Sequence, residues 1–376
     1  MSETLWNAFG RQAWQRAGEL LQKETLSLLE GEGVIAEFEA ALSARFGFPF
    51  VLATSSGTAA LQDALWAAQV SGGELLLPPN LPPYLIRAIS LLSARLCFVD
   101  IEPQRLGIDP QKAQEAVHPA TRAVLVVDQI GIPACTAALA PLRENGVVVI
   151  EDAAQAFSAQ EKGQPPGADA DMLVLSFQGA KSFGLGEGGA LLCRYRHHYE
   201  RALRFGQHPA RWLAEWDGGA VQKHFPQRIA MQHRISPLTA ALGVAMLVYY
   251  DAFEATRLAA VEVLRTAVST LPGLHTLELP EGLRPDWAVV PVQLPKGVSV
   301  QSVVRQLQQQ GIDADRFPQA FGLGRPSDGS LSPAIRYPVF ADLQQRLFAI
   351  GWAGAVRWEE HEMEAMCRAL QNALQF

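Results

Sequence analysis

The chain has 376 residues, of which 49% are hydrophobic and 18% are charged, and its formal net charge is −7. This length can bury one large hydrophobic core and a smaller second one. The acidic balance disfavours a nucleic-acid partner, and no apolar run reaches the length of a membrane span. The four cysteines are scattered without a CxxC pair, so we expect reduced thiols in a cytoplasmic protein and no metal site.

The first half of the chain alternates helical and strand patterns. Residues 1–30 predict an amphipathic helical arm, and residues 34–46 predict a second helix with one apolar stripe. Seven short apolar runs then alternate with helical stretches, and we expect strands near residues 50–54, 74–78, 95–99, 123–127, 147–151, 172–177 and 189–193. This alternation predicts an α/β fold with a mainly parallel sheet covered by helices.

The middle of the chain is less regular and then strongly helical. Residues 195–232 are rich in Arg, His and Trp, and we expect irregular structure that packs at a subunit interface or covers a site. Ser236-Pro237 predicts the start of a long helix that continues to about Ser269, because proline is favoured in the first helical turn.

The last third of the chain predicts a small α/β domain. Residues 288–292 read as a strand and residues 300–310 as a helix closed by a glycine, while residues 322–333 predict a flexible loop. We therefore divide the chain into a helical arm (residues 1–30), a large domain (residues 31–250) and a small C-terminal domain (residues 251–376).

A turn of small residues follows the first predicted strand. Ser56, Gly57 and Thr58 stand directly before a helical pattern. The free amides at a helix start, together with the positive end of the helix dipole, bind anions such as phosphate. An ordinary helix N-cap uses the same residue types, so this turn alone leaves both interpretations open.

Two carboxylates follow the apolar strand near residue 150. Glu151 and Asp152 stand where open α/β sheets place ligands, at the carboxyl end of a strand. A helix cap would account for one of these two carboxylates. Two carboxylates after so apolar a strand indicate that at least one meets a cationic partner.

A single lysine stands among small and apolar residues after the strand that ends at Ser176. Burial lowers the pKa of a lysine and makes Lys181 a better nucleophile. This pattern indicates a Schiff-base lysine, with a solvated loop lysine as the alternative. The following residues 184–189 fit GxGxxG, but an apolar strand rather than a helix comes next, which disfavours NAD binding.

A phosphate turn, a carboxylate and a lysine at three strand ends are the parts that pyridoxal 5′-phosphate (PLP) requires. Their order and spacing resemble the DegT/StrS type of nucleotide-sugar aminotransferases, a family of fold-type I PLP enzymes. The resemblance extends from about Gly31 to Gly311 and rests on Ser56-Gly57-Thr58-Ala59-Ala60-Leu61, Phe98-Val99-Asp100-Ile101, Glu151-Asp152-Ala153-Ala154-Gln155-Ala156, Ser176-Phe177 with Lys181, Gly186-Glu187-Gly188-Gly189, and Arg234 with Ser236-Pro237-Leu238.

The resemblance implies a role for each matching residue. Lys181 would bind PLP as a Schiff base and move protons, and Asp152 would pair with the pyridine nitrogen. Gln155 would lie near the ring hydroxyl. Ser56, Gly57, Thr58 and Ser176 would bind the phosphate.

The resemblance also implies partners. The enzyme would be a homodimer with its sites at the interface, and Gln232 would reach the cofactor phosphate of the partner subunit. The amino donor would be Glu or Gln, and the acceptor would be a keto group of a sugar or sugar-like intermediate.

Several positions that usually face the cofactor or substrate in this family are altered. Gln232 stands for an Asn, Leu81-Pro82 for a Thr–aromatic pair, Gln178 for a His, and Asp128 for another His; Tyr84 is the candidate to stack on the cofactor ring instead. We therefore expect PLP chemistry on an unusual acceptor.

Two alternatives remain at this stage. One is a PLP enzyme of the same fold that catalyses a dehydration or a condensation in natural-product assembly. A deoxygenating dehydratase of this family typically has His at the lysine position, so Lys181 disfavours it. The other is a PLP-sensing regulator, for which we would expect a basic DNA-binding domain.

Overall fold

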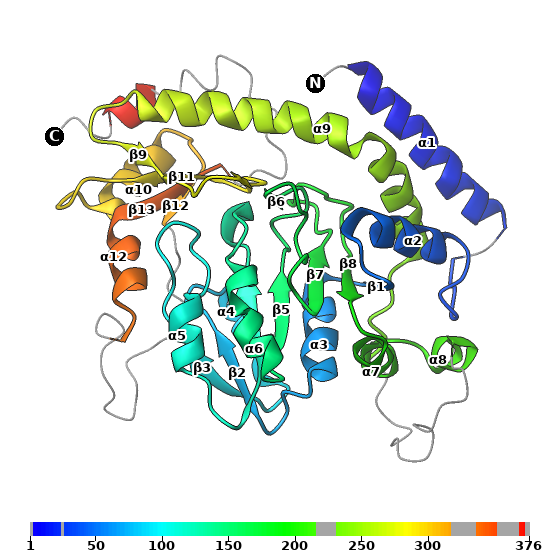
Figure 1. Ribbon diagram of the computed structural model, residues 1–376. Coiled ribbons are helices and arrows are strands. Elements are labelled where there is room, and N and C mark those ends of the chain that lie inside the picture. The colour runs from blue at the N-terminus through cyan, green and yellow to red at the C-terminus, as the bar shows by residue number, and fades with distance from the viewer. Residues whose placement is uncertain (1–2, 24–25, 216–230, 317–335, 352–367, 373–376) are drawn as a thin grey trace.

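The protein is built around one large sheet (Figure 1). The computed structural model describes residues 3–23, 26–215, 231–316, 336–351 and 368–372. The sheet has seven strands in the order β1-β8-β7-β5-β4-β2-β3. Their bounds are β1 Phe50–Thr54, β2 Glu74–Leu77, β3 Arg95–Phe98, β4 Thr121–Val127, β5 Val148–Asp152, β7 Met172–Ser176 and β8 Gly189–Cys193. Strand β8 is antiparallel to both of its neighbours, and every other pair of neighbours in this sheet is parallel, which confirms the predicted fold class.

Helices cover both faces of this sheet, and the apolar strand sequences follow from that. In β2, Leu75 and Leu77 pack under one layer of helices while Leu76 between them packs under the other. A strand buried on both faces is therefore mostly apolar, and a polar side chain on such a strand, such as Glu151 of β5, needs partners inside the protein. The first layer contains α3 (Gly57–Ala67), α4 (Pro83–Ser90) and α7 (Arg196–Gly206); the second contains α2 (Val34–Phe46), α5 (Pro110–Glu115), α6 (Ala140–Glu144) and the first half of α9 (Pro237–Ser269).

The expectation of irregular structure after residue 195 is wrong as far as residue 215. This stretch forms α7 and α8 (Pro209–Glu215). In α7 the buried Tyr199, Ala202 and Leu203 recur at helical spacing and join the core beside α3. Arginine and histidine on the other positions hide this stripe in the sequence.

In α8 a buried guanidinium connects to the edge of the sheet. Arg211 pairs with Glu39 of α2 at 2.8 Å. Glu39 in turn accepts a hydrogen bond from the amide of Ala53 in the edge strand β1 at 2.7 Å. This chain of contacts covers part of a strand edge that would otherwise present unpaired amides.

The long helix α9 joins two cores. Its first half, including Val244 and Tyr250, packs in the core of the large sheet, and its second half, including Leu264, packs in the core of a second sheet. Among the helices of the described ranges, only α9 has the length and apolarity of a membrane span, and half of its most apolar window is buried inside the protein. The start at Pro237 and end at Ser269 agree with the prediction.

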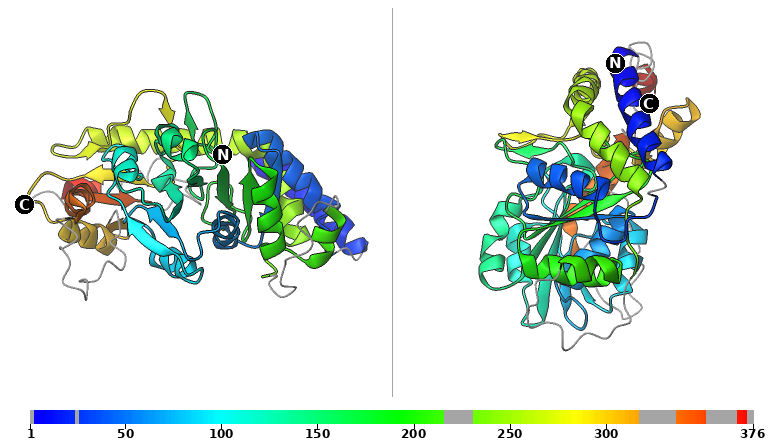
Figure 2. Two further views of the ribbon diagram at one scale, coloured as in Figure 1. Left: turned by 60° about the horizontal axis from the view of Figure 1, so that its bottom comes forward. Right: turned by 90° about the vertical axis from the view of Figure 1, so that its right-hand side faces the viewer.

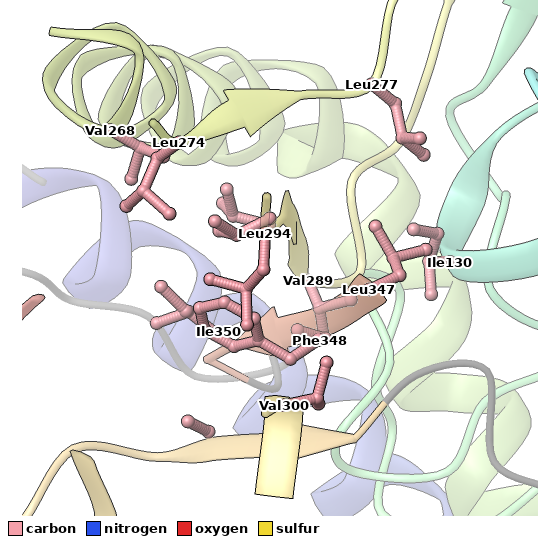
Figure 3. Close-up of a cluster of buried hydrophobic side chains, with 14 of the residues drawn as sticks. Ile130, Val268, Leu274, Leu277, Val289, Leu294, Val300, Leu347, Phe348 and Ile350 are labelled. Atoms are coloured by element: carbon pink, nitrogen blue, oxygen red, sulfur yellow. The ribbon is translucent and has the colours of Figure 1, made fainter. Parts of the chain in front are cut away.

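The second sheet has four strands in the order β12-β13-β11-β9 and is antiparallel. Its elements are β9 His275–Thr276, β11 Val290–Gln293, α10 Val300–Gln309, β12 Ala314–Arg316, α12 Pro338–Arg346 and β13 Leu347–Ile350. Figure 3 shows its core, in which Ile130 from the loop after β4 lies with Leu347 and Val289. A two-stranded ladder of β6 (Gln160–Glu161) and β10 (Leu283–Arg284) also connects the two parts.

The N-terminal helix α1 (Glu3–Gln22) lies along α9, and Figure 2 shows this pairing from two further sides. Trp6 packs on Phe253 with ring centroids 4.5 Å apart. The helix is shorter than the predicted residues 1–30, and Gly31 and Gly33 adopt positive φ angles before α2. The boundaries of the arm and the two domains stay predictions, and the predicted loop at residues 322–333 falls outside the described residues.

At Gly189 the backbone of β8 lies very close to the backbone of the turn before α3. Gly189 pairs with Thr54 on one side and with Ser176 on the other. A Cβ at this position would lie 2.5 Å from the backbone nitrogen of Gly57. No rotamer can relieve a clash with backbone, so only glycine fits here.

We predict that Gly189→Ala lowers the free energy of unfolding by about 1–3 kcal/mol, because the clash forces the turn before α3 away from β8. Thermal unfolding followed by circular dichroism measures the change. Gly10→Ala is the control: a Cβ there meets nothing within 4 Å, and we expect a change of no more than about 1 kcal/mol, in the stabilising direction. Equal effects of the two substitutions would contradict the prediction.

Candidate active site

The ends of four strands converge at one edge of the large sheet. Thr54, Gly189 and Ser176 lie in one row, because Gly189 pairs with both of the others. Asp152 ends β5 next to β7. Since β1, β5 and β7 run in the same direction, the residues that follow them all leave the sheet at this edge, as sequence reasoning predicts for a ligand site.

The turn after β1 is a helix N-terminus backed by a hydroxyl. Helix α3 begins at Gly57, and the Oγ of Ser56 caps it by accepting a hydrogen bond from the amide of Ala59 at 3.1 Å. A Cβ on Gly57 would lie 2.7 Å from the Cβ of Ser176, so the Ser176 side chain lies directly against this turn. Thr58 is half-buried in the first turn. The first amides of a helix lack partners within it, and together with these hydroxyls they make a suitable site for a phosphate.

Lys181 lies in the loop after β7 and is close to two buried carboxylates. Burial lowers its pKa, while the charges of Asp152 and Asp286 offset part of that effect. Burial raises the pKa of Asp152; the hydrogen bond from the amide of Ala154, 3.0 Å long, and the charge of Lys181 act in the opposite direction. The loop therefore holds a more nucleophilic amine beside a carboxylate that can bind a cationic ring nitrogen.

Gln155 is held by its carbonyl end. Its Oε1 accepts a hydrogen bond from the backbone amide of Ile130 at 2.9 Å. The side-chain NH₂ group is therefore the end that remains to donate. This orientation agrees with the predicted contact to an oxygen such as the ring hydroxyl of PLP, which stays a prediction.

Sequence reasoning missed Asp286, which lies more than 100 residues from Lys181 in the chain. Asp286 is fully buried and accepts hydrogen bonds from the Oγ of Ser182 at 2.7 Å and from the amide of Ser158 at 3.0 Å. It pairs with Arg257 of α9 at 2.5 Å. Burial and the nearby Glu254 raise the pKa of Asp286 to about 6. No local motif marks this residue, because its role depends on contacts between the two parts of the fold.

The altered positions separate into buried and exposed residues. Leu81 and Asp128 are buried. Gln178 is exposed, and its Oε1 accepts a hydrogen bond from the amide of Ala180 at 2.9 Å. Pro82 precedes α4, and Tyr84 belongs to the first turn of α4; the side chain of Tyr84 is outside the described residues, so its ring stacking stays a prediction.

Gln232 is exposed and has a positive φ of 57°. The next residue, His233, accepts a hydrogen bond from the amide of Ser55 at 2.8 Å with its backbone oxygen. Its ring nitrogen Nδ1 contacts the buried Asp63 of α3 at 2.8 Å. The segment that carries Gln232 is thus fixed beside the turn after β1, and its reach to a partner subunit stays a prediction.

These features define a class of protein. A mainly parallel sheet with one antiparallel strand, a helix N-terminus after its first strand, a buried Asp and a desolvated lysine fit the needs of PLP. The fold is that of fold-type I PLP-dependent enzymes.

Comparison with known proteins identifies the family. The sequence model of the DegT/DnrJ/EryC1/StrS aminotransferase family matches residues 9–351. The chain therefore belongs to this family of PLP-dependent enzymes, and its cofactor is PLP.

Individual proteins with similar sequences or structures share between 22% and 35% identity with this chain. MosB of Rhizobium meliloti is 35% identical over 197 residues, and the alignment covers 50% of this chain and 38% of MosB. The structure of DesV from S. venezuelae is similar with a TM-score of 0.81 at 23% identity, covering 99% of this chain and 98% of DesV. NtdA of Bacillus subtilis, solved with the cofactor PMP bound, has a TM-score of 0.80 at 22% identity, covering 98% of this chain and 82% of NtdA. These two structural likenesses concern the fold.

We predict that Asp286→Asn lowers the pKa of Lys181 further, because it removes one of the two negative charges that offset burial. Uptake of PLP by the cofactor-free protein requires a neutral amine. The rate of uptake, followed by visible absorption, should therefore reach half its maximum about one pH unit lower than in the native protein.

Ser182→Ala is the matched control, because it removes the hydroxyl bound to Asp286 and leaves both charges in place. We expect the midpoint of its pH profile to stay where it is in the native protein. If the two variants shift the profile equally, the charge of Asp286 does not act on Lys181.

Proposed function

We propose that this protein is an aminotransferase that moves an amino group from Glu or Gln to a keto group of a sugar or sugar-like intermediate. The observation that carries the proposal is the placement of Lys181 beside Asp152, at the same sheet edge as the turn of Ser56 and Gly57. Membership of the aminotransferase family supports it.

PLP supplies an electron sink when it is bound. Asp152 holds the proton on the ring nitrogen, and the Nζ of Lys181 takes a proton from the α-carbon of the donor and later delivers one to the carbonyl carbon of the acceptor. Ser56, Gly57, Thr58 and Ser176 bind the phosphate. The NH₂ group of Gln155 binds the ring hydroxyl.

We further propose that the active unit is a homodimer in which Gln232 of one subunit reaches the phosphate of the other. Large apolar side chains on α1, α8 and α9 are exposed in the single chain; Trp14 is 80% exposed, and Leu213 and Val248 are 58% and 63% exposed. The proposal expects the partner subunit to cover these side chains.

Visible absorption of the purified protein tests the amino-transfer half-reaction. L-glutamate or L-glutamine should bleach the band of bound PLP, and 2-oxoglutarate should restore it when glutamate was the donor. A band that no amino donor changes would favour a dehydration or condensation on the same fold. No band after PLP is supplied would overturn the assignment of Lys181.

We predict that Lys181→Ala abolishes turnover, with a loss of at least about 10³-fold, because no other group replaces its amine as nucleophile and proton carrier. Steady-state assays with the donor identified from the spectrum measure the loss. The variant should still bind PLP non-covalently, which separates lost chemistry from lost folding.

We predict that Asp152→Asn keeps PLP bound but slows turnover by about 10- to 100-fold, because a neutral amide replaces a charge-assisted hydrogen bond to the ring nitrogen. Comparison of kcat with PLP affinity distinguishes the two effects. Full activity in this variant would contradict the role given to Asp152.

A further inference from the structure

Two carboxyl groups lie against each other behind the proposed cofactor site. Asp128 directly follows β4, Glu151 lies in the neighbouring β5, and the two side chains are only 1% and 4% exposed. Their carboxyl groups are in hydrogen-bond contact with each other. Neither takes part in an ion pair within the described residues.

The other contacts of this pair are too few to hold two negative charges. The Oδ1 of Asp128 accepts one hydrogen bond, from the amide of Ala134 at 2.8 Å, and its Oδ2 is buried with no donor in the described parts of the chain. Glu151 accepts a hydrogen bond with its Oε1 from the amide of Gly167 at 3.0 Å, and the hydroxyl of Thr136 is its other neutral donor. Burial of an unpaired carboxylate is costly.

The charged groups around the pair do not supply a cation. Asp152 of β5 acts on Asp128, and Asp169 acts on Glu151, and both are acidic. Arg105 reaches the neighbouring carbonyl of Ala134 at 3.2 Å, but its own charge is paired with Glu161 at 2.8 Å. A positive partner does not explain the burial.

We infer that Asp128 and Glu151 hold one proton between them, and that this shared proton fixes the loop of residues 128–134 against the cofactor site. An ionised carboxylate only accepts hydrogen bonds. A hydrogen bond between two carboxyl groups therefore requires that one of them carries the proton. The inference about the cofactor site rests on the proposed function; the shared proton does not.

The loop that the pair fixes carries contacts to the site. The amide of Ile130 binds Gln155, and the carbonyl of Gly131 accepts a hydrogen bond from the amide of Asp286 at 2.8 Å. The amide of Asp128 itself donates to the backbone oxygen of Asp152 at 3.0 Å. Figure 3 shows Ile130 within the core of the second sheet. Asp128 and Glu151 are thus positioning residues for Gln155 and for the start of the small sheet.

The sign of the pH dependence follows from burial. Burial and the charge of Glu151 raise the pKa of Asp128 well above its ordinary value. The folded protein therefore keeps a proton that the unfolded chain loses near pH 4. Stability falls as pH rises from about 4 through the pKa of the folded pair, since the unfolded state binds fewer protons over that range.

Asp128→Asn tests the shared proton, because an amide donates a hydrogen bond at any pH. The Tm of this variant minus the Tm of the native protein should increase by about 2–4 °C between pH 5 and pH 8. Its affinity for PLP should not fall over the alkaline range in which that of the native protein falls. Glu151→Gln places the amide on the other partner and should give the same two results.

Asp171→Asn is the control: it removes a buried carboxylate that pairs with Arg143 at 3.1 Å, and we expect a lower Tm at both pH values. The inference is overturned if Asp128→Asn loses stability equally at pH 5 and pH 8, or if both amide variants fail to fold. The stability measurement does not involve PLP or turnover, so it stands even if the aminotransferase proposal fails.

Discussion

The site depends on one electrostatic constraint: the amine of Lys181 must be partly removed from water while it stays close to Asp152 and Asp286. Burial favours the neutral amine of Lys181, and Asp152 and Asp286 partly restore its charge. The balance leaves an amine that is a better nucleophile than a solvated lysine and is still attracted to its partners. Because both carboxylates are themselves buried, each needs its own donors, and all of these except Ser182 lie outside the loop of Lys181.

The support for Asp286 ties the chemistry to the join between the two sheets. Arg257 in the middle of α9 contacts both Asp286 and Glu254, and Glu254 also binds the hydroxyl of Ser158. The same helix fills both hydrophobic cores. A shift of the small sheet relative to the large one would therefore move Asp286, and through Ser182 it would move the loop that carries Lys181.

The sequence was most informative where burial is complete. Strands covered on both faces are mostly apolar, so the sequence predicted their positions in the chain directly. Helix α7 was missed because arginine and histidine residues, of which His198 and Arg204 are buried, interrupt its apolar stripe. Lys181, Asp152 and the turn before α3 could be predicted because each directly follows or lies near a strand end. Asp286 could not, because only the packing of the second sheet brings it to Ser182.

The altered residues of this chain do not all bear on the acceptor. Asp128, which the family resemblance aligns with a histidine, lies behind the sheet edge and contacts Glu151. A neutral imidazole and a protonated imidazole can each donate a hydrogen bond to a carboxylate, whereas an aspartate can do so only while it holds a proton. In this chain Asp128 can donate to Glu151 only while it keeps a proton, and burial together with the charge of Glu151 favours that proton. The unusual acceptor stays a prediction, and the exposed Gln178 and Gln232 are the altered positions that we propose to contact it, because a buried carboxyl pair can alter the pH range of the enzyme without altering what its site binds.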